Sequence, residues 1–446
     1  MRKLLIANRG EIALRVNRAA HELGIATVAI FSEADRGALH VRAADESYCV
    51  GPGPAARSYL NVPNIISAAL ISGADAVHPG YGFLAENARF AEICADHGLR
   101  FVGPAPAVIA QMGDKAVAKR LMERAGVPTT PGSDILASLD DAKKAARQIG
   151  YPVLLKATAG GGGKGMRGVR DAAELEHAYA TAQAEAEANF KDGRLYLERL
   201  IERPMHVEVQ VLGDEHGALV HVGERDCSVQ KPSHQKLIEE APAPRIGDRV
   251  RERLHGLAVE AARAVGYTSA GTLEFLVDGE SIYFMEMNTR IQVEHPVTEM
   301  LYGIDLVAQQ LRIADGHPLG VTQAELVPRG HAIECRINAE DGGFAPAAGK
   351  LDEVYLPGGY GVRVDSHIYG GMAVTPYYDS LLAKVIAHAA SRDAAIARME
   401  AALGDARITG VATSIDMCRA VLADETFRRG GVGVDYLPAL VGAAPV

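Results

Sequence analysis

The stretch Glu286-Met-Asn288-Thr-Arg290-Ile-Gln292-Val-Glu294-His295 is the most informative part of this sequence. Side chains of an extended chain alternate between two faces, so a strand here has one polar and one apolar face. The polar face carries Glu286, Asn288, Arg290, Gln292 and Glu294. A polar sheet edge facing water is the plain alternative. A row of carboxylate, amide and guanidinium groups instead suits a site that holds a metal, an anion and a general base.

A second carboxylate, Glu274, lies in an earlier apolar segment and is expected to face Glu286 across a hairpin. Directly opposite residues have Cβ atoms about 5 Å apart. A tight turn at Asp278-Gly279 would put the two carboxylates on opposite faces. A shared metal therefore requires a wider loop, such as Gly279-Glu280-Ser281. Together with Asn288 these are hard oxygen ligands, which favour Mg²⁺ or Mn²⁺ over zinc.

A glycine-rich segment, Lys156-Ala-Thr-Ala-Gly160-Gly-Gly-Gly163-Lys164-Gly165, follows a short apolar strand candidate at Val153 to Leu155. Consecutive glycines permit left-handed backbone conformations and bring N–H groups close to an anion. This is not a Walker A loop, because Gly165 stands where that motif has Ser or Thr. A flexible linker is the alternative, but the flanking strand and cations favour a phosphate-binding loop.

Composition limits the classes of protein to consider. At 446 residues, roughly three domains are expected. The formal charge of −10 argues against a nucleic-acid partner. The five cysteines form no C-x-x-C pair and are expected to be buried thiols in a reducing cytosol. The N-terminal apolar stretch is too short for a signal peptide, and no run reaches the length of a membrane span. We therefore expect a cytoplasmic protein without a membrane or nucleic-acid partner.

The pattern of apolar runs predicts three units. Residues 1–113 alternate strand and helix, which indicates a doubly wound, Rossmann-like domain, although without the dinucleotide fingerprint. Its expected strands and helices are Leu4–Ala7, Thr27–Phe31, Ala74–His78, Glu11–Leu23 and Val62–Ser72. Residues 114–330 carry the metal-site stretch, with the glycine segment in a small mobile lid at 130–204. Residues 331–446 form the third unit, which includes a helix at Ser391–Leu403.

Longer motifs connect these features to a known family. They are Ile6-Ala-Asn-Arg-Gly-Glu-Ile-Ala13, His78-Pro-Gly-Tyr81-Gly-Phe-Leu-Ala-Glu-Asn87, Met112-Gly-Asp-Lys115, Gly223-Glu-Arg-Asp-Cys-Ser228, His234-Gln-Lys236, Glu239-Glu-Ala-Pro-Ala-Pro244 and Gly330-His-Ala-Ile-Glu-Cys-Arg336-Ile-Asn-Ala-Glu-Asp341. With these motifs the chain resembles, over nearly its whole length, the biotin carboxylase component of biotin-dependent carboxylases, within the ATP-grasp superfamily. The resemblance implies an α/β and α+β fold, with a Rossmann-like N-terminal domain, an ATP-grasp fold with a mobile lid and a mixed C-terminal domain.

The resemblance also implies an activity, the ATP-dependent carboxylation of carrier-bound biotin with bicarbonate through carboxyphosphate. The implied nucleotide-site residues are Lys115, Lys156, Gly162, Gly163, Lys164, Glu198, Arg199, Leu200, Ile201, His206, His234, Glu274 and Glu286. Mg²⁺ or Mn²⁺, at two expected sites, would be held by Glu274, Glu286 and Asn288. Bicarbonate would be held by Lys236, Arg290, Gln292 and Val293. Glu294 would be the catalytic base, and biotin would contact Tyr81 and Arg336.

Several of these residues also have ordinary structural interpretations. Lys115 taken alone could be a solvated lysine at a helix start, and His206 and His234 could be core histidines. Arg336 could belong to a structural ion pair. One segment departs from the family pattern: Lys231-Pro232-Ser233 stands, one residue longer, where the family has Arg-Arg.

The resemblance implies partners as well. The chain has no Met-Lys-Met biotinylation motif, so a separate biotin carboxyl carrier protein and a carboxyltransferase are expected. Acetyl-CoA carboxylase, and with it fatty acid biosynthesis, is the default assembly; a propionyl-CoA assembly and a piece cut from a longer chain are the alternatives. A homodimer is expected, with interface positions at Arg15, Arg18, Glu22, Tyr360 and Arg363. Two other functions stay open, namely a different ATP-grasp ligase and a non-catalytic nucleotide sensor.

Overall fold

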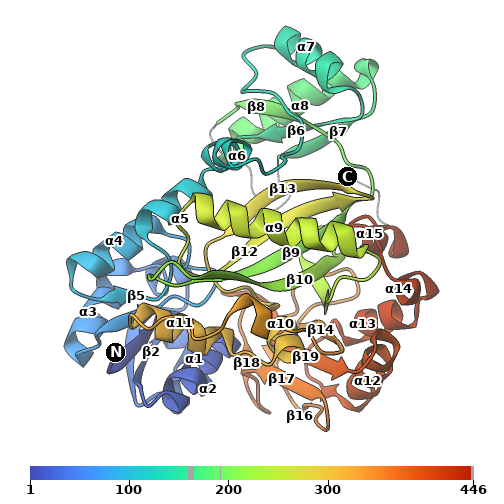
Figure 1. The fold of residues 1–446 in the computed structure, drawn as a ribbon. Helices are drawn as coiled ribbons and strands as arrows, with labels where there is room; N and C mark the ends of the chain where they lie inside the picture. The colour runs from blue at the N-terminus through green and yellow to red at the C-terminus, as the bar shows by residue number, and fades with distance from the viewer. Residues whose placement is uncertain (159–164, 191, 443–446) are drawn as a thin grey trace.

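The computed structural model describes residues 1–158, 165–190 and 192–442. Its N-terminal part is a parallel sheet that lies between helices (Figure 1). The sheet has the order β3-β2-β1-β4-β5. Its strands are β1 (Lys3–Ile6), β2 (Ala26–Ser32), β3 (Glu46–Gly51), β4 (Ala76–His78) and β5 (Arg100–Phe101). Its helices are α1 (Gly10–Glu22), α2 (Leu39–Ala43), α3 (Val62–Ser72), α4 (Ala88–Asp96) and α5 (Pro106–Gly113). The Rossmann-like prediction is confirmed, and the expected elements end within two residues of their observed positions.

A small subdomain stands apart from the rest of the chain at the top of Figure 1. It contains α7 (Leu139–Ile149), β6 (Val153–Ala157), β7 (Met166–Val169), α8 (Ala172–Phe190) and β8 (Leu195–Arg199). Its three antiparallel strands follow the order β7-β6-β8. The subdomain buries its own apolar cluster around Val153, Leu155, Leu175 and Leu197. These residues correspond to the predicted lid.

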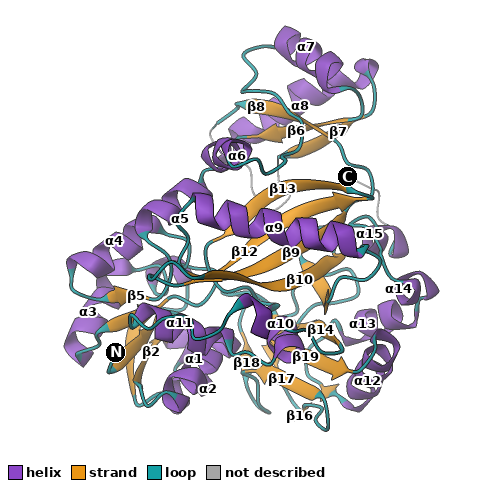
Figure 2. Ribbon diagram, viewed as in Figure 1, coloured by secondary structure: helices purple, strands orange, loops and turns teal. Residues whose placement is uncertain are grey.

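An antiparallel sheet of eight strands forms the body of the molecule (Figure 2). Its order is β13-β12-β9-β10-β11-β14-β19-β17. The strands are β9 (Met205–Gly213), β10 (Leu219–Gln230), β11 (Lys236–Ala241), β12 (Ser269–Asp278), β13 (Ser281–Asn288), β14 (His331–Asn338), β17 (Val362–Ser366) and β19 (Leu381–Ala389). The β11–β14 pairing carries this sheet across the expected boundary between the second and third units.

Helices cover the sheet on both sides of that boundary. They are α6 (Lys115–Arg124), α9 (Asp248–Ala264), α10 (His295–Tyr302), α11 (Leu306–Ala314), α12 (Arg392–Asp405), α13 (Ile415–Ala423), α14 (Glu425–Arg429) and α15 (Tyr436–Leu440). Short strands β15 (Gly349–Lys350), β16 (Val354–Tyr355), β18 (Ala373–Val374) and β20 (Arg407–Ile408) complete the C-terminal part. Ser391 caps α12, which confirms the helix predicted there. In the described residues, no helix combines the length and the apolar run that crossing a membrane requires.

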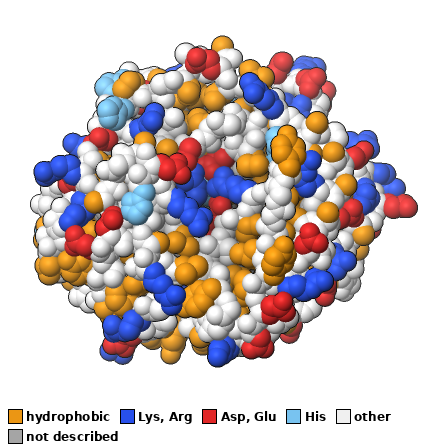
Figure 3. Space-filling model, turned by 90° about the horizontal axis from the view of Figure 1, so that it is seen from below, with side chains coloured by type: hydrophobic (Ala, Val, Ile, Leu, Met, Phe, Trp, Pro, Cys, Tyr) orange, Lys and Arg blue, Asp and Glu red, His pale blue; other side chains and the backbone are white. Residues whose placement is uncertain are grey.

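The lower face of the molecule, near α1, α2 and β16, mixes charges of both signs with apolar side chains (Figure 3). Blue and red side chains meet near its centre, with orange ones around them. Of the five cysteines, Cys49 is exposed and the other four are buried. The expectation that all five are buried is therefore wrong for Cys49, which lies on the edge strand β3.

Glu274 and Glu286 stand directly opposite each other in the β12–β13 hairpin, as expected. The loop, however, is a tight two-residue turn, because Asp278 pairs with Ser281. A β-bulge at Met285 shifts the register by one residue, which puts both carboxylates on one face. The prediction that a wider loop is needed is wrong, since the bulge produces the same alignment.

The polar row is not one continuous strand. β13 ends at Asn288, the chain bends at Thr289 and Arg290, and α10 begins at His295 with Glu294 as its N-cap residue. Side chains beyond Asn288 therefore converge because the chain turns, and the strict alternation expected for residues 286–294 is wrong after that point.

Candidate active site

A cavity of about 2150 Å³ lies between the small subdomain, the central sheet and the N-terminal domain. It is lined by most of the residues named from the sequence, namely Tyr81, Lys115, Lys156, Glu198, Arg199, His206, His234, Lys236, Glu274, Glu286, Asn288, Arg290, Gln292, Val293 and Arg336. Leu200 and Ile201, which follow β8, and the fully buried Glu294 are not among the described lining residues. Gly162, Gly163 and Lys164 lie outside the described part of the chain.

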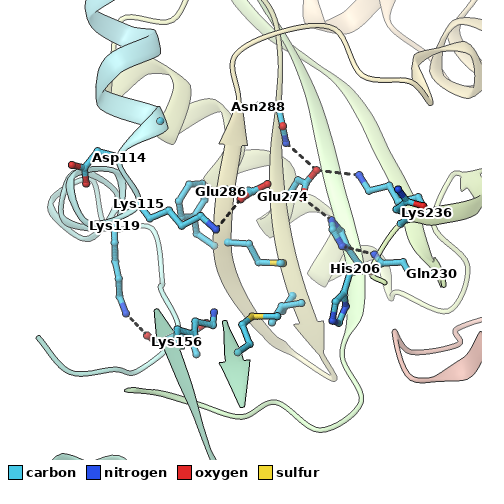
Figure 4. Close-up of a pocket in the computed structure, with 18 of the residues that line it drawn as sticks. Asp114, Lys115, Lys119, Lys156, His206, Gln230, Lys236, Glu274, Glu286 and Asn288 are labelled. Atoms are coloured by element: carbon cyan, nitrogen blue, oxygen red, sulfur yellow. Dashed lines mark hydrogen bonds and ion pairs between the residues drawn. The ribbon is translucent and has the colours of Figure 1, made fainter. Parts of the chain in front are cut away.

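Three lysines, Lys115, Lys119 and Lys156, lie at the end of the cavity nearest the small subdomain (Figure 4), and two of them contact the same carboxylate. Lys156 Nζ lies 2.5 Å from one oxygen of Glu198, and Lys119 Nζ lies 3.3 Å from the other. Burial raises the pKa of Glu198, but the two lysines outweigh it and leave the pKa below its usual value. Lys115, with its side chain 52% exposed, points toward Glu286 at 3.7 Å. This end therefore gathers cations that suit phosphate groups.

Lys119 was not predicted from the sequence. It lies four residues after Lys115 on α6, a spacing that puts both lysines on one helix face. The side chain of Asp114 accepts a hydrogen bond from the Val117 N–H and fixes the start of the helix. The i,i+4 spacing from Lys115 was the available signal.

The two facing carboxylates differ in how they are neutralised. Glu274 Oε1 accepts hydrogen bonds from Lys236 Nζ at 3.0 Å, Asn288 Nδ2 at 2.9 Å and Gln292 Nε2 at 2.9 Å. Burial opposes its ionisation, yet Lys236 and its other partners hold the pKa of Glu274 well below its usual value. Burial and the charge of Glu274 instead raise the pKa of Glu286. A divalent cation beside this oxygen-rich pair would relieve that repulsion, so these residues fit the expected metal.

His206 lies at the cavity wall rather than in the apolar core. Its Nε2 is 3.0 Å from Glu274 Oε2, and its Nδ1 is 2.8 Å from the side-chain amide of Gln230. These contacts orient the imidazole toward the carboxylates (Figure 4). Gln230 was not predicted as a site residue, and it also lines the cavity.

The segment that departs from the family pattern forms a tight turn. The His234 N–H donates to the Lys231 carbonyl at 2.8 Å, and the Lys231 N–H donates to the Gln235 carbonyl at 2.8 Å. The extra residue is thereby absorbed, and His234, with a φ of 61°, still faces the cavity. The Lys231 ammonium is buried and pairs with Glu340 beyond β14.

A fully buried carboxylate, Glu294, anchors the opposite end of the site. Its Oε1 lies 2.6 Å from Lys236 Nζ, and its Oε2 lies 3.0 Å from Arg336 Nη2. Burial raises its pKa, but Lys236, Arg336 and Arg225 dominate and hold the pKa of Glu294 far below the usual value. The carboxylate is therefore ionised and able to accept a proton once a substrate engages the neighbouring cations.

Arg290 connects this carboxylate end to the residues that are expected to hold the metal. Its Nη2 donates to Asn288 Oδ1 at 2.8 Å and its Nη1 to Gln292 Oε1 at 3.1 Å. Glu86, from the N-terminal domain, accepts from Nε at 2.9 Å. Glu86 was not predicted, because only the folded chain brings it near Arg290. The backbone carbonyl of Val293 accepts from Lys384 at 2.8 Å.

Arg336 and Tyr81 face the cavity from different domains. Arg336 Nε donates to Glu239 at 2.6 Å, and its Nη2 contacts Glu294. The structural ion-pair interpretation and the cavity position therefore both apply to Arg336. The Tyr81 hydroxyl donates to Glu11, and burial followed by the charge of Glu11 raises the pKa of Tyr81 well above its usual value.

The expected interface positions fall into two groups. Arg15 and Arg363 both pair with Glu299 inside the chain, at 2.8 and 2.7 Å. Tyr360 is 92% exposed. Arg18 and Glu22 are also exposed, on α1.

Comparison with known proteins first defines the class. Residues 114–322 match the family described as Carbamoyl-phosphate synthase L chain, ATP binding domain. Residues 1–109 match the family Biotin carboxylase, N-terminal domain, and residues 334–439 match the Biotin carboxylase C-terminal domain. The cation-lined cavity beneath a small subdomain therefore belongs to an ATP-dependent ligase.

The relatives then identify the family. A curated biotin carboxylase of Nostoc sp. is 53% identical over 439 residues, which are 98% of each chain. A biotin carboxylase–β-γ-ATP complex from Campylobacter jejuni superposes with a TM-score of 0.94 at 49% identity, covering 98% of each chain. The biotin carboxylase domain dimer of Hydrogenobacter thermophilus 2-oxoglutarate carboxylase, bound to MgADP, ADP and bicarbonate, gives 0.93 at 50% identity, covering 100% and 99%. The chain belongs to the biotin carboxylase family.

Proposed function

We propose that this enzyme uses ATP and bicarbonate to carboxylate biotin on a carrier, giving carboxybiotin, ADP and phosphate. The main support is that Lys236 and Arg336, which line one end of the cavity, both contact the fully buried Glu294, while the other end of the cavity gathers lysines. A base, an anion-binding lysine and an arginine beside a phosphate-binding region are what the two steps of this reaction need.

Nucleotide binding would use the end near the small subdomain. Lys115 and Lys156 would contact ATP phosphates, replacing their present carboxylate partners. The glycine segment at Gly162, Gly163 and Lys164 would cover the phosphates. His206, His234 and the segment Glu198-Arg199-Leu200-Ile201 would complete the site, with Glu274 and Glu286 below.

The expected Mg²⁺ or Mn²⁺ would be held by Glu274, Glu286 and Asn288. When bound, it would neutralise charge on the phosphates of ATP during transfer. Asn288 Oδ1 already accepts a hydrogen bond from Arg290. The residues proposed to hold the metal and the arginine proposed to bind bicarbonate are therefore held in fixed positions relative to each other.

Bicarbonate would lie against Arg290, Gln292, the Val293 backbone and Lys236. Its oxygen attacks the γ-phosphorus of ATP as ADP leaves, and Glu294 takes its proton, which gives carboxyphosphate. Carboxyphosphate breaks down to CO₂ and phosphate, and that phosphate removes the N1′ proton of biotin. Arg336 would stabilise the ureido enolate oxygen, and the enolate then attacks CO₂. Tyr81 would contact biotin beside Arg336.

We also propose the surroundings in which the enzyme works. The acceptor is a biotin carboxyl carrier protein, served by a separate carboxyltransferase, in a cytoplasmic acetyl-CoA carboxylase that supports fatty acid synthesis. Arg18, Glu22 and Tyr360 would contribute to a homodimer, and their exposure supports this. Residues 1–113, 114–330 and 331–446 would be the three domains, in agreement with the extents of the three matched families.

The test is phosphate release from ATP by the purified protein, with and without bicarbonate and free biotin. We expect release that requires bicarbonate and rises with biotin. Release that ignores biotin but responds to an amine or another carboxylate would assign the chain to a different ATP-grasp ligase. Nucleotide binding without any turnover would assign it to a sensor.

A further inference from the structure

A carboxyl group with no hydrogen-bond partner among the described residues, that of Glu334, lies two residues before Arg336 on β14. Glu334 is fully buried, and neither of its carboxyl oxygens has a partner among the described residues. It is the Cα partner of Glu239 in the β11–β14 ladder, so their side chains stand on one face about 5 Å apart at Cβ. One oxygen of Glu239 also lacks a partner, while its other oxygen accepts from Arg336. Two carboxyl groups thus face each other with unused oxygens.

The charges around Glu334 come from several elements. Arg336 lies two residues along β14, so it shares the face of Glu334. The surrounding titratable groups are Glu239 on β11, Lys384 on β19, Glu294 before α10 and Tyr81 after β4. Lys384 is already engaged with Glu11 and with the Val293 carbonyl. Like-charged carboxylates so close in a buried place cannot both be ionised at low cost.

We propose that Glu239 and Glu334 share one proton and together act as positioning residues for Arg336. This inference rests on the proposed function, because it concerns how Arg336 serves biotin. With one proton retained, the pair carries a single negative charge that anchors the guanidinium through Glu239. A second full carboxylate would neutralise Arg336 further and weaken its pull on the enolate oxygen.

The titration directions agree with this arrangement. Burial, with the charge of Glu294 added, outweighs Arg336 and raises the pKa of Glu239 to about 7. Burial and the charge of Glu239 raise the pKa of Glu334 well above its usual value, despite Lys384. A raised pKa means that the proton is held at neutral pH and lost as pH rises. Biotin-stimulated turnover should therefore fall on the alkaline side, while basal ATP cleavage should not share that fall.

The decisive variant is Glu334→Gln, because glutamine copies the shape and neutrality of a protonated acid. We expect its biotin-stimulated phosphate release at neutral pH to stay within about 3-fold of the wild type, and the alkaline fall to disappear. Glu239→Gln should lose about 10-fold or more in biotin-stimulated release, with basal release changed less, because Arg336 loses its charged anchor. If Glu334→Gln kept the alkaline fall, or lost as much activity as Glu239→Gln, the shared proton would be excluded.

Infrared spectroscopy supplies a readout that does not depend on activity. The neutral-pH difference spectrum between wild type and Glu334→Gln should contain one carboxylic-acid C=O band that shifts in deuterated water. Glu240→Gln is the matched control, since Glu240 is the next buried residue on β11 but bonds to Arg392 and His331. That control should keep both the band and the alkaline fall. If the band is absent from the wild type, the inference fails.

The two failures are distinguishable. If biotin never stimulates release, or if Arg336→Ala lowers basal and biotin-stimulated release equally, the proposed function of Arg336 fails, and the infrared band alone decides whether the pair shares a proton. If Arg336→Ala behaves as proposed but the infrared band or the alkaline fall in biotin-stimulated release is missing, only the inference on Glu239 and Glu334 fails.

Discussion

The two ends of the cavity are built differently. At the nucleotide end, Lys115 is half exposed and lies 3.7 Å from Glu286. At the carboxylate end, the Glu294 side chain is 0% exposed, and Lys236 and Arg336 hold it at 2.6 and 3.0 Å. The Lys115–Glu286 contact is a weak, solvated pair, although Glu198 at the same end is paired more closely with Lys156 and Lys119, whereas the second arrangement is a closed network of charges.

This difference indicates which ion pairs the substrates displace when they bind and which ion pairs stay in place. An exposed ion pair contributes little to stability, so ATP phosphates can displace it at small cost. A buried network is costly to break, so its members keep their geometry before bicarbonate and biotin arrive. The nucleotide end is therefore completed by its ligand, and the carboxylate end is preorganised by the fold.

The strongest way to break the preorganised end is Glu294→Gln. Losing a positioned base should reduce bicarbonate-dependent phosphate release by about 10²–10⁴-fold. ATP should still bind, because the lysines of the other end are untouched; equilibrium binding of a fluorescent ATP analogue measures this. Near wild-type turnover would remove Glu294 from the role of base.

Arg336→Ala and Arg290→Ala separate the roles of two arginines at the carboxylate end of the cavity. Loss of one donor to a developing oxyanion typically costs about 10²–10³-fold, so Arg336→Ala should lose that much of the biotin-stimulated rate. Its basal bicarbonate-dependent ATP cleavage should fall much less. Arg290→Ala should lower both rates, because it would contact bicarbonate itself. Phosphate release with and without biotin compares them, and equal losses in Arg336→Ala would leave it a structural residue.

Stability should depend on pH through a buried histidine just before Tyr81. Burial lowers the pKa of His78 from 6.5 to about 4. The neutral form is therefore native, and its stabilisation is complete above pH 6.5 and is lost as pH falls toward 4. That shift corresponds to about 3 kcal/mol. Urea unfolding between neutral pH and pH 4 should show the loss, and His78→Gln should reduce it; His40 and His367, whose pKa values burial also lowers, keep part of the pH dependence. An equal slope in both proteins would contradict the assignment.

The smallest effect is expected at the exposed nucleotide end. Lys115→Ala should raise the KM for ATP by about 10-fold, the usual worth of one charge-assisted hydrogen bond, with kcat changed less. Lys144→Ala is the matched control, because Lys144 is a lysine on the exposed face of α7. It should leave KM unchanged. If Lys115→Ala lowered kcat by a larger factor than it raised KM, Lys115 would act mainly by stabilising the transition state.

The sequence predicted this site unevenly, for identifiable reasons. The Glu274–Glu286 pairing followed from counting residues about the turn, but the bulge at Met285 has no signature in the sequence. The row of polar residues was recognised, although its strand ends at Asn288. Lys119 could have been found from helical spacing. Glu86 could not, because it meets Arg290 only through tertiary packing.

The same limit explains the positioning residues. Glu239 and Glu334 lie in motifs that were recognised, but their pairing depends on the β11–β14 register. Strand order between distant segments is a property of the whole sheet, and local periodicity carries no information about it. The Rossmann-like N-terminal fold, in contrast, followed from alternating apolar runs, and the ATP-grasp fold followed from the family resemblance; this fold class was confirmed.

The continuous sheet has a practical consequence for anyone who wants to express part of this protein. A fragment ending at residue 330 would remove β14 and leave β11 as a bare edge, with a row of unpaired N–H and C=O groups. A fragment beginning at residue 331 would expose β14 in the same way. Both halves would be prone to pair with further copies of themselves. The expected domain boundary at 330 is therefore a poor place to divide the gene.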